Sequence, residues 1–234
     1  MSADPDGGGA APGAGLWRRA NDALELWLYH LNLRNHWLFR RMEDVNELYA
    51  RLVFRGVRRD AMRIDETIQG RDRSFRIRFL TPDDAPMLSA LVARFDFRYL
   101  PPHPLDASAV LRALRRPSHL PFGLFRDGEP VGYCLVRLAA PRRCFTGVWT
   151  FPVPENAGLS RAAVRCTGRF VDAHGIEAYV TVPLDNTASR KGAEWAGWRV
   201  IRQNRLFYVL RRPLPPRRFP FARPERAPER AGRS

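Results

Sequence analysis

The chain has 234 residues, of which 45% are hydrophobic and 11% aromatic. This composition suits one full-size domain with appendages and excludes a wholly disordered chain. Three cysteines exclude a disulfide scaffold and favour a reducing compartment, and no uncharged apolar run approaches the ~18 residues of a membrane-spanning helix. Because the first residues also lack the basic and apolar parts of a signal peptide, we expect a cytoplasmic protein.

The net charge is +15, and only one of the 39 basic residues, Lys191, is a lysine. A GC-rich coding background produces such a preference for arginine, so the total charge is weak evidence for a nucleic-acid partner. Its distribution is more informative, because residues 75–212 carry +10 of the total. We therefore expect a polyanionic ligand in that block, with a nucleic-acid binder only as a third possibility.

The N-terminal part is predicted to contain a disordered lead, residues 1–15, and a helical arm, residues 16–74. The lead is mostly Gly, Ala, Pro and Asp, which cannot bury enough apolar surface to fold. Residues 16–61 contain no proline, and apolar residues recur alternately four and three positions apart, which predicts a helix. This seam consists of Leu24, Leu28, Leu31, the polar Asn35, Leu38, Met42, Val45, Tyr49 and Leu52.

Three interpretations of the arm remain open. As a helix or a helical hairpin it could pack on the domain that follows, which the sequence favours. It could form a homodimer through residues 16–61, with Asn35 fixing the register of the two helices. It could also lie on an anionic membrane surface, which is the least favoured of the three, since several arginines accompany the seam.

Strands and helices alternate through residues 75–212. Alternating or short apolar runs predict strands at residues 75–79, 122–125, 131–138, 145–151, 176–183, 199–201 and 206–210. Helical periodicity with start signals predicts helices at residues 81–95, 106–115, 159–174 and 187–195. An Asp-Gly pair at 127–128 predicts a tight hairpin, and the Pro- and Arg-rich residues 213–234 should remain an extended, disordered tail.

Residues 150–160 are the first candidate for a ligand site, because they join a strand to a helix. A helix N-terminus offers unpaired N–H groups and a positive dipole end, and Gly158 would let the backbone approach an anion closely. This pattern suits a phosphate cradle, and it suits an ordinary strand–loop–helix turn equally well.

The order of elements and several motifs resemble the GNAT acyltransferase family, over residues 75–212. The family's fourth strand and third helix read V-x-P-x-x-[RQ]-x-x-G-x-[GA]. The matching positions here are Thr150, Pro152, Glu155, Gly158 and Ser160, of which the first, third and last depart from the pattern. Asn186 and Ser189 match the family's N-x-x-[AS], Gly197 matches its next glycine, and residues 77–85 and 128–132 are similar to its opening strand and second hairpin.

The resemblance implies an α/β (α+β) fold, with a mixed, mostly antiparallel sheet and helices on both faces. It also implies acetyl-CoA or another acyl-CoA as co-substrate, an amine as acceptor, and no metal. The pantetheine arm would bind backbone near Phe151 and Val153, between two splayed strands. The cofactor-binding set is completed by Ala157, Gly158, Leu159, Ser160 and Arg161, whose N–H groups would hold the pyrophosphate, and by Asn186 and Ser189.

The catalytic residues are less evident. A backbone N–H beside a bulge in residues 145–151 would polarise the thioester carbonyl. The position of the family's usual acid, a tyrosine, is occupied by Ala193, and Glu155 puts a negative charge where the family has Arg or Gln. Arg161, Arg165, Arg190 and Lys191 could compensate for that charge.

The loop of residues 95–104 would contact the acceptor, and within it His103 is our first choice of base, ahead of Asp96 and Tyr99. The resemblance thus implies N-acyltransfer by direct attack in a ternary complex. The alternative is a non-catalytic GNAT-like interaction module that uses the helical arm. The three cysteines have no metal-ligand spacing and are predicted to be small core residues.

Overall fold

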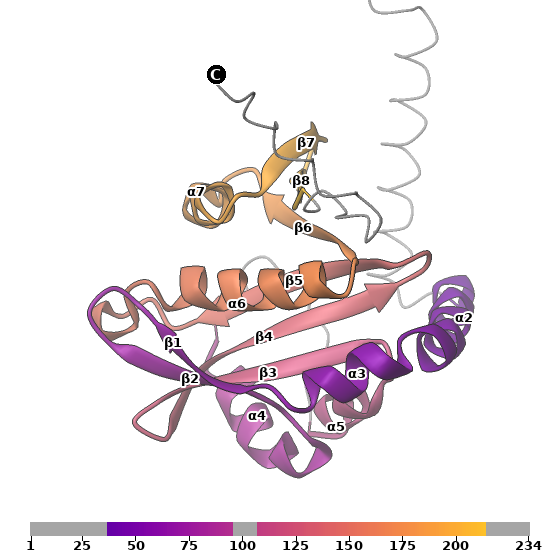
Figure 1. The fold of residues 1–234 in the computed structure, drawn as a ribbon, viewed down its shortest axis with the longest axis horizontal. Helices are drawn as coiled ribbons and strands as arrows, with labels where there is room; N and C mark the ends of the chain where they lie inside the picture. Colours follow the sequence, from indigo (N-terminus) through magenta and orange to yellow (C-terminus); the bar gives the residue numbers. More distant parts are fainter. Residues whose placement is uncertain (1–36, 96–106, 214–234) are drawn as a thin grey trace, which may run out of the picture.

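The computed structural model describes residues 37–95 and 107–213 of the chain. One eight-stranded sheet organises these residues, with the strand order β1-β2-β3-β4-β5-β6-β8-β7 (Figure 1). The strands are β1 (Asp65–Gln69), β2 (Ser74–Phe79), β3 (His119–Arg126), β4 (Glu129–Ala139), β5 (Arg143–Thr150), β6 (Glu177–Pro183), β7 (Arg199–Gln203) and β8 (Phe207–Arg211). All neighbours pair antiparallel except β5 and β6, which are parallel. The predicted fold class is confirmed.

Helices cover both faces of the sheet. The described helices are α2 (Trp37–Val53), α3 (Arg55–Ala61), α4 (Ala85–Val92), α5 (Ala107–Arg115), α6 (Leu159–Ala173) and α7 (Thr187–Trp195), with two 3-10 turns at Pro82–Asp84 and Pro154–Asn156. Figure 1 shows α6 on one face and α4 with α5 on the other. Successive strand residues divide accordingly, since Tyr133 packs with the α4–α5 core and Cys134 with the α6 core.

Local signals placed most of these elements correctly. Asp127 and Gly128 both have positive φ, at 50° and 86°, as the predicted tight hairpin between β3 and β4 requires. The Thr81 N–H donates to Asp84 Oδ2 at 2.8 Å, which starts the helical segment where the sequence predicted. Cys134, Cys144 and Cys166 are buried and unpaired, as expected for core residues.

The N-terminal arm differs from its prediction in two ways. The predicted helical seam is interrupted at Phe54, which separates α2 from α3 in the sequence and is fully buried. The sheet also begins at Asp65 rather than at residue 75, because β1 lies inside the range predicted as helical. Only Ile68 is buried in this edge strand, so β1 has no alternating apolar pattern that would reveal it.

The predicted seam packs on the domain only in part, through Tyr49, which lies against the core beside the buried Ala50. Met42, Val45 and Leu52 of the seam are exposed. Instead Asn46 donates to the Leu138 carbonyl at 3.0 Å, and Glu43 forms ion pairs with arginines of the domain. Polar anchors decide the orientation of α2 because they satisfy backbone and charged groups at the end of β4. Homodimerisation through residues 16–61 stays a prediction.

The predicted lead and tail lie outside the described residues. Within the described ranges, no helix is long and apolar enough to cross a membrane.

Candidate active site

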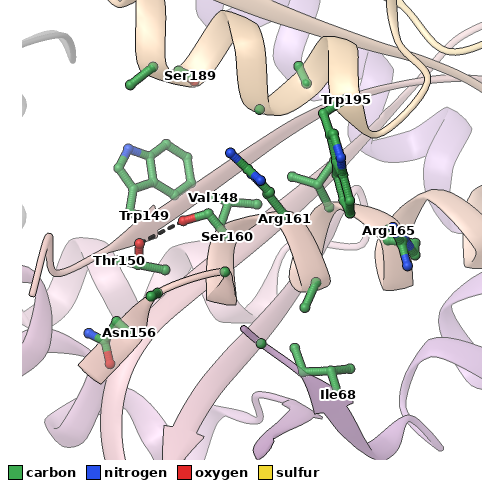
Figure 2. Close-up of a pocket in the computed structure, with 18 of the residues that line it drawn as sticks. Ile68, Val148, Trp149, Thr150, Asn156, Ser160, Arg161, Arg165, Ser189 and Trp195 are labelled. Atoms are coloured by element: carbon green, nitrogen blue, oxygen red, sulfur yellow. Dashed lines mark hydrogen bonds between the residues drawn. The ribbon is translucent and has the colours of Figure 1, made fainter. Parts of the chain in front are cut away.

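The strands β5 and β6 separate after a short paired segment. Their parallel pairing ends at Phe145 and Tyr179, and β6 then continues only alongside β8. A cavity of about 1530 Å³ opens at this separation (Figure 2). Its wall comes from β1 and the turn after it, the end of α4, β5 with the following loop, the start of α6, and α7.

Backbone groups of β5 point into the cavity. The Phe151 N–H donates to the Val131 carbonyl at 3.4 Å, so the odd-numbered residues here face β4. Because this direction alternates along an antiparallel ladder, the N–H and C=O groups of Val148 and Thr150 face the opening. A ligand lying between the strands could bond to them as an added strand would.

The residues predicted for this role are placed differently. Phe151 lines the cavity, but its N–H is already bonded to β4. Val153 is exposed outside the cavity wall, and its N–H donates to the Phe151 carbonyl at 2.9 Å. The proline-containing sequence after β5 indicated which loop borders the cavity. Only the strand register identifies Val148 and Thr150 as the residues whose backbone groups face it.

The predicted bulge in residues 145–151 is wrong. Strand β5 pairs with β4 residue for residue from Arg143 to Thr150. Any polarisation of a bound carbonyl by β5 must therefore come from a regular strand position whose N–H faces the opening. Val148 N–H meets this condition.

The loop before α6 is held by close backbone contacts. Gly158 has a φ of 81°, and a Cβ there would lie 2.6 Å from the Arg71 nitrogen. The Arg71 N–H, from the β1–β2 turn, donates to the Ala157 carbonyl at 2.9 Å. Glycine is therefore needed at 158 both for its backbone conformation and for space.

Helix α6 begins with its N-terminus at the cavity. The Gly158 carbonyl accepts from the Ala162 N–H at 3.0 Å, so the N–H groups of Leu159, Ser160 and Arg161 precede the first intrahelical bonds. Ala157, Gly158, Ser160 and Arg161 line the cavity. The Leu159 side chain is fully buried beneath the helix and anchors it. Such an arrangement favours an anion.

Two polar contacts fix this end of the cavity. Thr150 Oγ1 and Ser160 Oγ lie 2.7 Å apart and join β5 to α6 (Figure 2). The buried Asn156 donates to the Phe151 carbonyl at 3.1 Å and accepts from Arg126 at 3.2 Å. Sequence reasoning missed Asn156, because an isolated loop asparagine carries no periodic signal. Its neighbour Glu155 is exposed and does not line the cavity.

The cavity wall is cationic. The guanidinium groups of Arg161 and Arg165 lie 5.2 and 4.5 Å from the ring centre of Trp195 (Figure 2). Arg71, Arg94 and Arg169 also line the cavity, whereas no carboxylate does among the residues described. Of the other predicted cations, Arg190 stacks on Tyr208 at 4.8 Å, and neither it nor Lys191 reaches the wall.

Aromatic side chains line the part of the cavity near the end of α4, namely Phe95, Trp149 and Phe151, with Tyr133 behind them. Phe95 stacks on Phe151 at 4.4 Å, and Tyr133 stacks on Trp149 at 4.7 Å. Arg94 lies over the Phe151 ring at 4.6 Å. Sequence reasoning did not assign this cluster, since its members come from three separate elements.

The helix α7 brings Asn186 and Ser189 to the cavity. Asn186 Oδ1 accepts from the Ser189 N–H at 3.0 Å and so caps the helix N-terminus. One turn further, Ala193 is buried on the wall and offers no hydroxyl. The buried Trp198 also lines the wall, and its indole N–H has no acceptor among the residues that the structure describes.

No titratable acid or base other than arginine lines the described part of the wall. His103, Asp96 and Tyr99 lie outside the described residues. No three His, Cys, Asp or Glu side chains within residues 37–95 and 107–213 are grouped so as to hold a metal ion.

Comparison with known proteins identifies solved structures with a similar fold. No protein-family model and no curated protein matches the chain. Among solved structures, the GNAT domain of S. lividans PAT has 18% identity over 63% of this chain and 95% of its own, with a TM-score of 0.56. Mycobacterium smegmatis RimJ, in complex with CoA-disulfide, has 17% identity over 63% and 85%, with a TM-score of 0.51.

A third similar structure is RimL, a ribosomal L7/L12 alpha-N-protein acetyltransferase, with 14% identity over 63% of this chain and 94% of its own. Its TM-score is 0.52. At these identities the likeness concerns the fold alone. The chain therefore has the fold of the GNAT acetyltransferases.

Proposed function

We propose that this protein is an N-acyltransferase that moves an acyl group, acetyl being the first to test, from acyl-CoA to an amine. The observation that carries the proposal is the opening between β5 and β6, with a helix N-terminus and a carboxylate-free set of arginines at its wall. CoA matches these features in kind, because it joins an extended amide chain to a group of phosphates. RimJ, which shares the fold, is described with a CoA disulfide bound.

Each part of the cavity suits one part of the co-substrate. The Val148 carbonyl and the backbone groups of Thr150 would pair with the pantetheine amides, and the N–H groups at residues 159–161 would receive the pyrophosphate. Arg161 and Arg165 would neutralise the remaining phosphate charge, since arginine forms strong charge-assisted hydrogen bonds with phosphate. The unsatisfied indole N–H of Trp198 is a further donor at the wall.

The chemical step is a direct transfer. The amine nitrogen attacks the thioester carbonyl carbon, the C–S bond breaks, and the CoA thiolate leaves as the amide forms. The Val148 N–H would stabilise the negative charge on the carbonyl oxygen. The ammonium proton passes through a base to water, and we propose His103 for that base, while the thiolate leaves without a protein acid at position 193. Bringing both substrates together supplies much of the rate enhancement.

Calorimetric titration of the full chain with acetyl-CoA, longer acyl-CoAs and CoA tests the binding step. Saturable binding, followed by release of free CoA thiol in the presence of a panel of amines and peptide N-termini, is expected. Absence of binding at millimolar ligand would defeat the proposal. His103→Ala should lower kcat and leave the affinity for acyl-CoA unchanged. An unchanged kcat would show that His103 is not the base.

A second candidate function has support from the same wall. Ala193 replaces the family's usual acid, and the described wall contains no other acid or base than arginine. A non-catalytic module that binds CoA and uses its helical arm to hold a partner would have these properties. Saturable CoA binding with no thiol release across the amine panel would favour this alternative.

A further inference from the structure

Helix α2 meets the domain through polar residues together with Tyr49 and Ala50, and it turns other apolar residues away from the domain. Glu43 and Asn46 contact the domain, whereas the outward residues of the helix are spaced three, four and eight apart, which puts them on one side. This outer stripe consists of Trp37, Val45, Leu48 and Leu52, with exposed fractions of 67, 69, 59 and 72%. Val45, Leu48 and Leu52 adjoin one another on successive turns, and exposed apolar residues grouped in this way mark an interaction surface.

Positive charge accompanies the outer stripe. Arg41 lies four residues before Val45, and Arg51 lies three residues after Leu48, so both neighbour the stripe on the helix surface. Arg41 has only a 3.8 Å contact with the exposed Asp44. Arg51 and Arg55 have no acidic partner within the described part of the chain. The surface is therefore apolar and cationic together.

We infer that this surface docks on an anionic lipid bilayer, with α2 lying in the plane of the interface. Apolar side chains would enter the acyl boundary while the arginines reach the headgroups, as in interfacial amphipathic helices. The inference does not rest on the proposed function, since the outer stripe and the cavity share no residue.

Two observations favour a bilayer over a protein partner. Helix α2 lies at the margin of the described fold, beside the end of β4 (Figure 1). Three of the six tryptophans of the chain, Trp17, Trp27 and Trp37, occur in its first 37 residues, and tryptophan prefers membrane interfaces.

Vesicle co-sedimentation of the full chain tests the inference. We expect binding to vesicles of phosphatidylcholine mixed with phosphatidylglycerol, and much weaker binding to phosphatidylcholine alone. Leu52→Asp should weaken binding to the mixed vesicles at least about tenfold, because it removes a leucine from the apolar contact. Arg51→Ala should weaken it about fivefold, and by less at high salt.

Matched substitutions on the far edge of the sheet serve as controls. Ile201→Asp and Arg199→Ala change exposed residues of β7 and should leave vesicle binding as in the wild type. All four positions are exposed, so thermal melting should confirm that each variant folds. Failure of the wild type to bind either vesicle would overturn the inference. Loss of a dimer in Leu52→Asp by analytical ultracentrifugation, without an effect on vesicles, would assign the stripe to a second copy instead.

Discussion

Arginines serve different purposes in two regions of this protein. At the junction between α2 and the sheet, Arg116 and Arg137 both pair with Glu43, and Arg58 donates to the backbone carbonyls of Leu114, Arg116 and His119. At the cavity, arginines stack on aromatic rings and no carboxylate lies among the described wall residues. Satisfied arginines stabilise structure, and uncompensated ones indicate an anionic ligand, so the partners of a charge are more informative than its number.

The largest effect on stability is expected from His119, which lies at the junction between α2 and the sheet. Burial, with repulsion from Arg137 and Arg116, lowers the pKa of His119 from 6.5 to about 3. Between these two values the unfolded chain holds a proton that the folded chain does not. The neutral His119 therefore contributes its full stabilisation above pH 6.5. As the pH falls toward 3, the unfolding free energy should decrease by roughly 4 kcal/mol.

Urea unfolding at a series of pH values measures this dependence. The variant His119→Gln has no titrating ring, so its stability should fall less steeply through the same window. A variant with the wild-type slope, whatever its absolute stability, would contradict the assignment.

In the loop before α6, added side-chain volume should lower stability more than a change of charge does. Gly158→Ala places a Cβ against the Arg71 backbone and also strains a left-handed conformation, so we expect a loss of about 3 kcal/mol in unfolding free energy. Gly128→Ala is the control, because its φ is also positive but nothing lies within 4 Å of the added Cβ. The control should lose about 1 kcal/mol. Equal losses in chemical denaturation would argue against the close backbone contact.

A carboxylate should matter at the junction and not beside the cavity. Glu43→Gln leaves Arg116 and Arg137 without their shared partner in a half-buried place, and should cost about 2 kcal/mol of unfolding free energy. The same change at the exposed Glu155 should cost less than about 0.5 kcal/mol. If denaturation gave similar values for both variants, the contrast between the two regions would fail.

The smallest effect on stability is expected for the cavity arginines. Arg165→Ala should change the unfolding free energy by less than about 0.5 kcal/mol, while weakening CoA binding roughly tenfold through loss of a charge-assisted contact. Arg73→Ala, an exposed arginine of the β1–β2 turn outside the wall, should alter neither quantity. Calorimetry on both variants checks this prediction. A large loss of stability in Arg165→Ala would mark that arginine as structural.

The sequence determined the elements whose signals are local. Alternation, helix starts and the Asp-Gly turn predicted the strands and helices of residues 75–212, and the spacing around Gly158 indicated the helix start at the cavity. These signals suffice because each depends on backbone preferences within a few residues. The edge strand β1 was missed for the same reason, since it has one buried residue and is defined by its pairing with β2.

Only the tertiary structure decided which groups face the cavity and which face of α2 packs on the domain. Arg71, Arg94, Trp195 and Asn156 meet at the wall from distant parts of the chain. The helical seam suggested that apolar residues would be buried, yet Glu43 and Asn46 face the domain because their partners, arginines and a strand-end carbonyl, are brought there by β4. Periodicity fixes which residues share a face, and long-range partners decide where that face points.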